Sequence, residues 1–214
     1  QYANDFIKEG GGQFSWATDL GSSFVNSYSF YMLGSPFFWL SLLFPSAWLP
    51  YLMCPLLCLK FAVSGAGAFV WLRRYTKSRN LTIVGACLYA FSGFTVYNVF
   101  FNHFLDVIAL FPFLLWALDE AVLEKRRGPF AVLVALNLVN SYFFFAGQAV
   151  FLLLYFFIKL GSGEYKLKWG HFGWLFFEAV LGCVMGCALL LPAIVSLAGN
   201  PRTVDLSSGF GFLL

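Results

Sequence analysis

Two acidic residues with aromatic neighbours are the parts of this sequence best suited to chemistry. Asp19 lies in the aromatic segment 16–21, and Asp106 follows His103 by three positions, so these two share a face on one helical turn. A carboxylate in such a place can take a proton from a hydroxyl group or hold a divalent cation against a phosphate. A loop acid can also be merely solvated. Both interpretations stay open for Asp19 and Asp106, although an idle charge within apolar sequence is costly.

Lys60 is a cation near the middle of a long apolar stretch, where an ionisable residue usually has a function. It predicts either a contact with the phosphate of a lipid carrier or an ion pair with a carboxylate such as Glu178. Arg202, in the polar segment 200–208, is a second candidate for binding the phosphate.

Several kinds of site are missing from the sequence. It has no phosphate-binding glycine-rich loop and no HExxH, GxSxG or CxxC motif, which argues against a nucleotide-driven pump or a hydrolase of the soluble type. No motif requires a cofactor, and a divalent cation held by an outer carboxylate is an open alternative.

Composition places the chain among integral membrane proteins. Of its 214 residues 60% are hydrophobic and only 11% charged, and the mean hydropathy is +0.78. Apolar runs near the ~20 residues that cross a bilayer recur along the chain and are continuous, which predicts an all-α, polytopic helical bundle. We expect a single membrane domain over residues 1–214, as a fragment of a longer chain.

Basic residues predict the orientation of this bundle. Most of the 13 Lys and Arg residues fall into three clusters between apolar stretches: Arg73, Arg74, Lys77 and Arg79; Lys125, Arg126 and Arg127; Lys159, Lys166 and Lys168. Short basic loops stay on the cytoplasmic side. This accounts for the net charge of +3 without nucleic acid as a partner, and it puts residues 1–35, the turn at 102–106 and the segment 200–208 on the external face.

The predicted spans follow from these clusters. We expect a short interfacial or re-entrant piece at 36–44 and full spans at 47–72, 81–101, 107–123 and 171–197. Residues 129–159 form either one tilted span or a hairpin of two short helices with its apex near 140–142, and the charge rule favours the hairpin.

The ordered set of motifs resembles the bacterial YfhO membrane proteins, within the GT-C-type superfamily of glycosyltransferases that use polyprenyl-phosphate sugars. The resemblance covers nearly the whole chain, and its most specific piece is Tyr-Ala-Phe-Ser-Gly-Phe at 89–94. The other matching positions are Gln1-Tyr2, Trp16 with Asp19-Leu20-Gly21, Tyr28 to Tyr31, Ser35-Pro36-Phe37, Lys60, His103 with Asp106, Pro112, and Asn140 with Tyr142-Phe143.

The resemblance implies a multi-pass enzyme of the bacterial plasma membrane that moves a sugar from undecaprenyl phosphate to a cell-envelope polymer such as teichoic acid. Taken together with the residues discussed above, it leaves Asp19, Asp106 and His103 as catalytic candidates, and Gln1, Tyr2, Lys60, Tyr142 and Arg202 as substrate-binding candidates. The main family Asp is expected a few residues before Gln1, outside this sequence. The alternative is a transporter or flippase of a lipid-linked precursor, with Lys60 and Glu178 as a charge relay.

Overall fold

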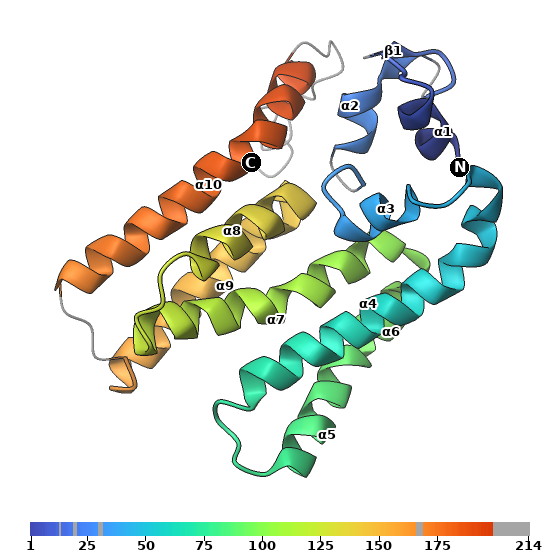
Figure 1. Cartoon of the computed structure of the whole chain (residues 1–214). Coiled ribbons are helices and arrows are strands. Elements are labelled where there is room, and N and C mark those ends of the chain that lie inside the picture. The colour runs from blue at the N-terminus through green and yellow to red at the C-terminus, as the bar shows by residue number, and fades with distance from the viewer. Residues whose placement is uncertain (13, 19–20, 30–31, 166–168, 199–214) are drawn as a thin grey trace, which may run out of the picture.

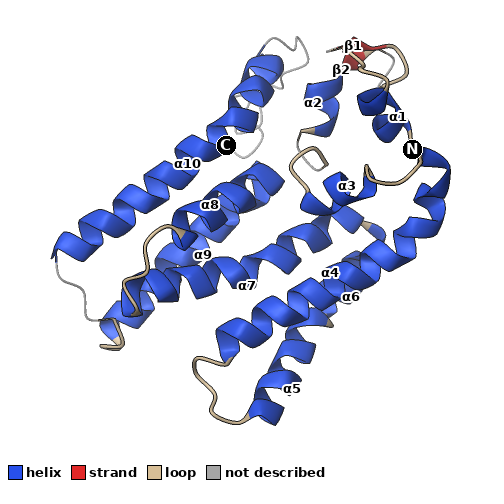
Figure 2. Cartoon of the chain, in the orientation of Figure 1, coloured by secondary structure: helices blue, strands red, loops and turns tan. Residues whose placement is uncertain are grey.

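The computed structural model describes residues 1–12, 14–18, 21–29, 32–165 and 169–198. They form a bundle of long helices with a small N-terminal region at one end (Figure 1). Almost all regular structure is helical, as the sequence predicts, apart from one two-stranded hairpin in the N-terminal region (Figure 2).

The N-terminal region is built from short pieces. In chain order these are α1 (Tyr2–Lys8), β1 (Phe14–Ser15), β2 (Ser22–Ser23), α2 (Phe24–Tyr28), α3 (Pro36–Ser41) and the 3₁₀ turn η1 (Ser46–Trp48). A small apolar core of Ala3, Phe24 and Leu33 holds it together. The predicted interfacial piece at 36–44 corresponds to α3, which is too short to span a membrane.

The helices of the main bundle follow. They are α4 (Leu49–Leu72), α5 (Arg79–Ala90), α6 (Gly93–Tyr97) with the turn η2 (Asn98–Phe100), α7 (Asn102–Leu123), α8 (Pro129–Asn140), α9 (Tyr142–Gly161) and α10 (Trp169–Ala198). Within the described residues, four stretches are long and apolar enough to cross a membrane: Ser46–Leu72, Arg79–Phe100, Tyr142–Gly161 and Gly170–Pro192.

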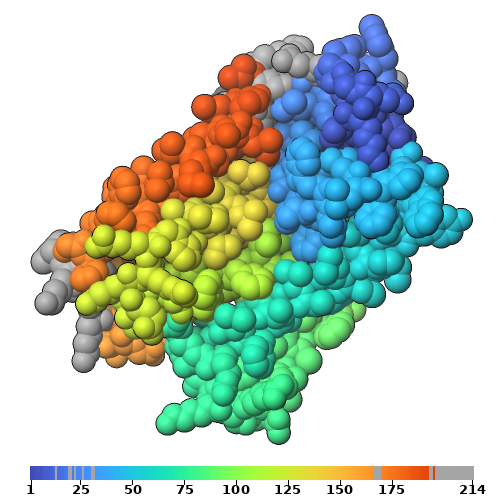
Figure 3. All heavy atoms as spheres, viewed as in Figure 1, coloured from blue at the N-terminus to red at the C-terminus, as the bar shows by residue number. Residues whose placement is uncertain are grey.

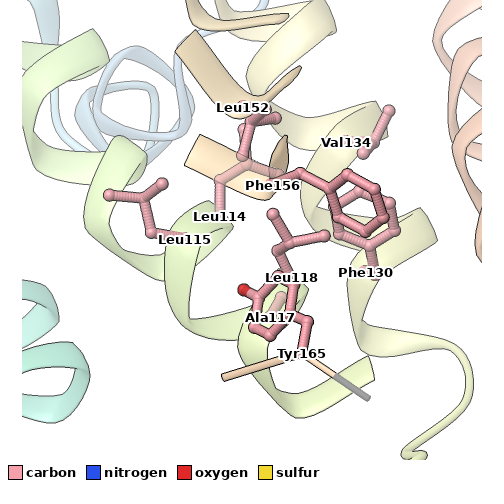
Figure 4. Packing of buried hydrophobic residues seen from close by; sticks show 9 residues of the cluster. All are labelled: Leu114, Leu115, Ala117, Leu118, Phe130, Val134, Leu152, Phe156 and Tyr165. Carbon is pink, nitrogen blue, oxygen red and sulfur yellow. The ribbon is translucent and has the colours of Figure 1, made fainter. Parts of the chain in front are cut away.

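Side-by-side packing runs in the order α5, α4, α7, α8 and α10 (Figure 1). The central helix α7 is mostly buried, and Ala109, Leu114 and Ala117 have no exposed surface. Leu114 belongs to the main core, where α7, α8 and α9 meet Tyr165 (Figure 4). A central helix has neighbours on several sides and so cannot show the one-sided apolar stripe of a surface helix.

The predicted hairpin at 129–159 is present, but only its first helix is short: α8 has 12 residues, whereas α9 has 20 and is long enough to cross a membrane. The chain breaks between α8 and α9 at Ser141, whose backbone is extended (φ −161°, ψ 102°). Tyr155 and Tyr165, near and beyond the C-terminal end of α9, both bond to Asp119 near the C-terminal end of α7. The chain has therefore returned to the end of the bundle from which α8 started.

The predicted second span has an internal break that sequence reasoning missed. α5 ends at Ala90, and Ser92 caps α6 by accepting a hydrogen bond from the Thr95 N–H. Tyr89 donates a 3.0 Å hydrogen bond to the Ile108 carbonyl of α7. The Tyr-Ala-Phe-Ser-Gly-Phe motif thus ends one helix, starts the next and ties the break to the centre of the bundle.

Close helix packing explains another motif. At Gly182 an added Cβ would lie 2.6 Å from the Ala131 carbonyl oxygen, and at Gly186 one would lie 2.5 Å from a Leu138 side-chain carbon. This Gly-x-x-x-Gly spacing, which is typical of close helix packing in membranes, therefore lets α10 lie directly on α8.

The described members of the three basic clusters share one end of the bundle, which we call the basic end. Arg74 and Arg126 both pair with Glu120, and Lys159 lies over the ring of Tyr75, 4.1 Å from its centroid. Lys166 and Lys168 lie outside the described residues. The common location is what the charge pattern predicts.

Candidate functional site

A cavity of about 300 Å³ lies between the N-terminal region and the neighbouring ends of α4 and α7. This is the end of the bundle opposite the basic end, and in the space-filling view the N-terminal region covers it (Figure 3). The cavity is lined by Gln1, Ala3, Asn4, Met32, Ser35, Phe37, Phe38, Ser41, Leu49, Met53, Leu56, Lys60, Asn102, His103 and Asp106.

An ion pair between Lys60 and Asp106 is the electrostatic centre of this cavity. Lys60 Nζ lies 2.5 Å from Asp106 Oδ1, and the two residues are only 6% and 3% exposed. Two buried opposite charges in contact have each lost their hydration, so each depends strongly on the other. Lys60 therefore forms an ion pair with a carboxylate, as one of its two interpretations predicts, but the carboxylate is Asp106 and not Glu178.

Glu178, the carboxylate predicted to pair with Lys60, lies elsewhere. Its Oε1 accepts a 2.9 Å hydrogen bond from the Gly128 N–H and a 2.6 Å bond from Trp174 Nε1. Gly128 precedes α8 at the basic end, so Glu178 stabilises the positive N-terminal end of that helix. The proposed relay between Lys60 and Glu178 was wrong, because helix order along the chain does not determine which helices touch.

Two polar residues complete the surroundings of the pair. Asn102, the first residue of α7, accepts from Lys60 with its carbonyl (2.9 Å) and with its side-chain oxygen (2.6 Å). Ser35 donates a 2.5 Å hydrogen bond to Asp106 Oδ2. Lys60 thus has three oxygen acceptors, which matches the three donors of an ammonium group.

Local sequence explains why Ser35 is in place. Its side chain accepts the Phe38 N–H at 3.2 Å and caps α3, and Pro36 follows at the first helical position. This serine–proline order is a common helix start. Phe37 then lies with its ring 5.4 Å from Lys60 Nζ. The matching Ser-Pro-Phe segment therefore supplies one contact to each charge of the pair.

Sequence reasoning found half of the polar residues that line this cavity. Gln1, Lys60, His103 and Asp106 all line the cavity, and His103 lies beside Asp106 as the three-residue spacing predicts. It missed Ser35, Phe37, Asn102 and Asn4. The helix-start pattern at Ser35-Pro36 was available as a signal, but its target on α7 was not.

The remaining site candidates are not brought together there. The Tyr2 hydroxyl bonds to the Ser15 side chain, and neither Tyr2 nor Tyr142, the first residue of α9, lines the cavity. Asp19 and Arg202 lie outside the described residues.

A divalent cation fits the described cavity poorly. Its lining supplies one carboxylate, and the Lys60 ammonium lies where a cation beside that carboxylate would sit. Among the described residues, no three His, Cys, Asp or Glu side chains group as metal ligands.

A second buried carboxylate lies at the basic end. Asp119 has no exposed surface, and its two oxygens accept from Trp71, Tyr75, Tyr155 and Tyr165, at 2.5 Å for Tyr75 and Tyr165. The neighbouring Glu120 pairs with Arg74 and with Arg126, the latter at 3.4 Å. The position of both acids beside the second basic cluster predicts simple interfacial ion pairs for them. Glu120 forms such pairs, whereas Asp119 is enclosed by neutral hydrogen-bond donors.

Comparison with known proteins gives one match. The family model for the bacterial membrane protein YfhO matches residues 1–211, which is nearly the whole chain. No curated protein and no solved structure matches the chain.

Proposed function

Because the chain belongs to the YfhO family of bacterial membrane proteins, we propose that it is an integral-membrane glycosyltransferase. It moves a sugar from a polyprenyl-phosphate carrier to a cell-envelope polymer such as teichoic acid. The observation that carries this proposal is the cavity that brings Lys60 and Asp106 together at the end opposite the basic clusters. By the charge rule that end faces outward, where lipid-linked sugars meet envelope polymers.

The lining of the cavity suits an amphiphilic donor. One side is polar, with the ion pair, Asn102 and Ser35, while Leu49, Met53 and Leu56 of α4 form an apolar side. A sugar phosphate with an attached prenyl chain presents the same two characters. The cavity volume of about 300 Å³ is at the lower end of the range typical of small-molecule sites.

The ion pair supplies the two groups that the reaction needs. In the proposed step, Asp106 takes the proton of the acceptor hydroxyl, whose oxygen attacks the anomeric carbon as the bond from that carbon to the phosphate oxygen breaks. Lys60 stabilises the negative charge that develops on the leaving phosphate.

The resting contacts explain how the two roles remain separate. Without substrate, Lys60 is bound to Asp106 and to Asn102. A phosphate that enters the cavity attracts Lys60 and weakens its hold on Asp106, which is then available as a base. Ser35 keeps the carboxylate in position throughout, since its bond goes to the other oxygen, Oδ2.

The test uses the purified protein in proteoliposomes, supplied with undecaprenyl-phosphate hexoses and teichoic acid. We expect transfer of labelled sugar to the polymer, and a loss of at least about 100-fold in Lys60→Gln, because charge stabilisation of a leaving group is typically worth that much. Lys77→Gln, an exposed lysine at the basic end, is the matched control and should transfer normally.

The result also separates an enzyme from a flippase. An enzyme consumes the lipid-linked sugar in detergent solution, whereas a flippase only relocates it across a sealed bilayer. Relocation without any new glycosidic bond would overturn the proposal.

A further inference from the structure

A second cavity, distinct from the proposed catalytic one, opens between α9 and α10. It has a volume of about 340 Å³ and an entirely apolar lining, and we call it the α9–α10 groove. It exists because α10 packs on α8 and α9 packs on α7 and α8, while α9 and α10 make little contact with each other. Side chains of all four helices line it.

The groove has a buried floor and exposed rims. Leu118, Phe130, Val134, Leu152 and Phe156 form the floor, and all five belong to the main core drawn in Figure 4. Leu153 and Phe157 of α9 and Phe172 and Phe176 of α10 form the rims, and between 46% and 64% of each rim side chain is exposed. Exposed apolar rims indicate that the groove opens to the hydrocarbon of the bilayer.

One end of the groove carries a positive charge. Arg127 lies at the basic end, three residues before Phe130 of the floor, and its guanidinium stacks on Trp174 at 4.4 Å from the ring centroid. Trp174 directly precedes Leu175, which lines the groove. Among the described residues Arg127 takes part in no salt bridge, unlike Arg74 and Arg126.

Glu178, which bonds to the Trp174 indole beneath Arg127, forms no salt bridge with Arg127 among the described residues. Glu178 is 1% exposed, and its Oε1 is occupied by the Trp174 indole N–H and the Gly128 backbone N–H. Its negative charge therefore stabilises the N-terminus of α8 from within the protein. The Arg127 side chain, by contrast, is exposed on the surface of the basic end.

From this geometry we propose that the α9–α10 groove binds one anionic phospholipid of the cytoplasmic leaflet. An acyl chain lies in the apolar groove, and the lipid phosphate meets Arg127 at its basic end. Basic side chains at the cytoplasmic ends of grooves between membrane helices are suited to this role. The partner is a phospholipid and not the prenyl-linked donor, because the groove's cation lies at the end opposite Lys60.

Headgroup charge must provide the selectivity. A lipid chain gains little by leaving other lipid chains for an apolar groove, because both surroundings are equally apolar. Attraction of an anionic lipid to one basic residue is worth about 1 kcal/mol, which corresponds to a preference of about fivefold. Arg127 therefore determines which kind of lipid headgroup is preferred, and the groove holds the acyl chain of the single retained lipid.

The experiment measures lipid retention by native mass spectrometry. The protein is reconstituted in vesicles of equal parts phosphatidylglycerol and phosphatidylcholine, extracted in mild detergent, and its bound lipids are counted. We expect one retained lipid with about fivefold preference for phosphatidylglycerol. Arg127→Gln should abolish the preference, while Lys77→Gln, which removes the same charge from another basic loop, should keep it.

Filling the groove is the second measurement. Ala149 of α9 lines it, and Ala149→Phe should remove the retained lipid whatever its headgroup, with Ala149→Leu as a milder variant if the first folds poorly. Retention unchanged by groove filling, or a preference unchanged in Arg127→Gln, would overturn the proposal. Displacement of the phospholipid by added undecaprenyl phosphate would overturn it as well.

Discussion

Asp106 and Asp119 are two buried carboxylates on the same helix, about 20 Å apart by the rise of an α-helix, and their surroundings differ. Asp106 has a cation and a serine hydroxyl as partners and lines a cavity. Asp119 has one indole and three phenols, and it lines neither the cavity at Lys60 nor the α9–α10 groove. Burial of an acid therefore does not distinguish a site from a structural contact, but the kind of partner does.

The two sets of partners differ in how they can change. Lys60 can exchange one oxygen acceptor for another without leaving its helix, so a ligand phosphate can compete for it. The donors to Asp119 come from α4, α9 and the segments that follow them, which makes the aspartate a junction between distant parts of the chain. Such a network holds its members in place because each lost bond leaves a buried polar group unpaired.

The largest expected effect is a loss of sugar transfer when Asp106, the carboxylate that lines the cavity, is changed. Asp106→Asn keeps the shape of the side chain but removes the base, and we expect sugar transfer to fall by about 10²–10⁴-fold. The measurement is the rate of labelled sugar transfer in proteoliposomes. Glu124→Gln, the same chemical change at an exposed position at the end of α7, should leave the rate unaltered. Normal transfer by Asp106→Asn would remove its catalytic role.

Changing Asp119, the carboxylate enclosed by phenols, should lower the stability of the protein and not its activity. Asp119→Ala leaves three phenols and an indole N–H without their acceptor, and we expect a loss of about 3–5 kcal/mol in the free energy of unfolding. Denaturation in detergent, followed by circular dichroism, measures it. The fraction that stays folded should transfer sugar at the normal rate. If activity vanished while stability was kept, the contrast between the two carboxylates would be reversed.

A smaller effect is expected on the stability of the protein at alkaline pH. The pKa values of Tyr165 and Tyr75 lie above the ordinary 10.0, mainly because both phenols are buried and secondly because each donates a hydrogen bond to Asp119. The folded state then holds these protons more tightly than the unfolded chain, so stability is constant below about pH 10 and falls as the pH rises further. Tyr165→Phe should cost about 1 kcal/mol at neutral pH and make the alkaline decline shallower.

The control for this titration is Tyr51→Phe, because Tyr51 is 81% exposed. It should show the same alkaline decline as the unchanged protein. Equal curves for Tyr165→Phe and Tyr51→Phe would mean that the phenols around Asp119 do not couple protonation to folding.

The smallest effect is expected at the surface of the basic end. Arg126 is 65% exposed where it meets Glu120, and exposed ion pairs contribute about 0.2–1 kcal/mol or less. Arg126→Ala should therefore change the unfolding free energy by under about 1 kcal/mol, and high salt should reduce the difference. A loss as large as that of Asp119→Ala would show that the basic end is held by charge and not by its phenols.

Much of this architecture is predictable from the sequence. Apolar run lengths predict the helices, and the basic clusters predict that 129–159 is a hairpin, because only then does Lys159 return to the basic end. The break at 91–92 was missed because Phe91, Ser92 and Gly93 continue an apolar run, and run length alone does not reveal a capping serine. Half of the cavity's polar residues were also predicted, since Lys60 and Asp106 are conspicuous charges in apolar sequence.

The sequence by itself determined which segments are helical, which end of the bundle carries positive charge and which ionisable residues are costly to bury, because these depend on composition and local order. Only the tertiary structure decided that Lys60 meets Asp106 and not Glu178, and that Asp119 is enclosed by phenols. Such choices depend on contacts between helices distant in sequence, and hydrophobicity, which makes helices in a membrane look alike, does not specify their neighbours.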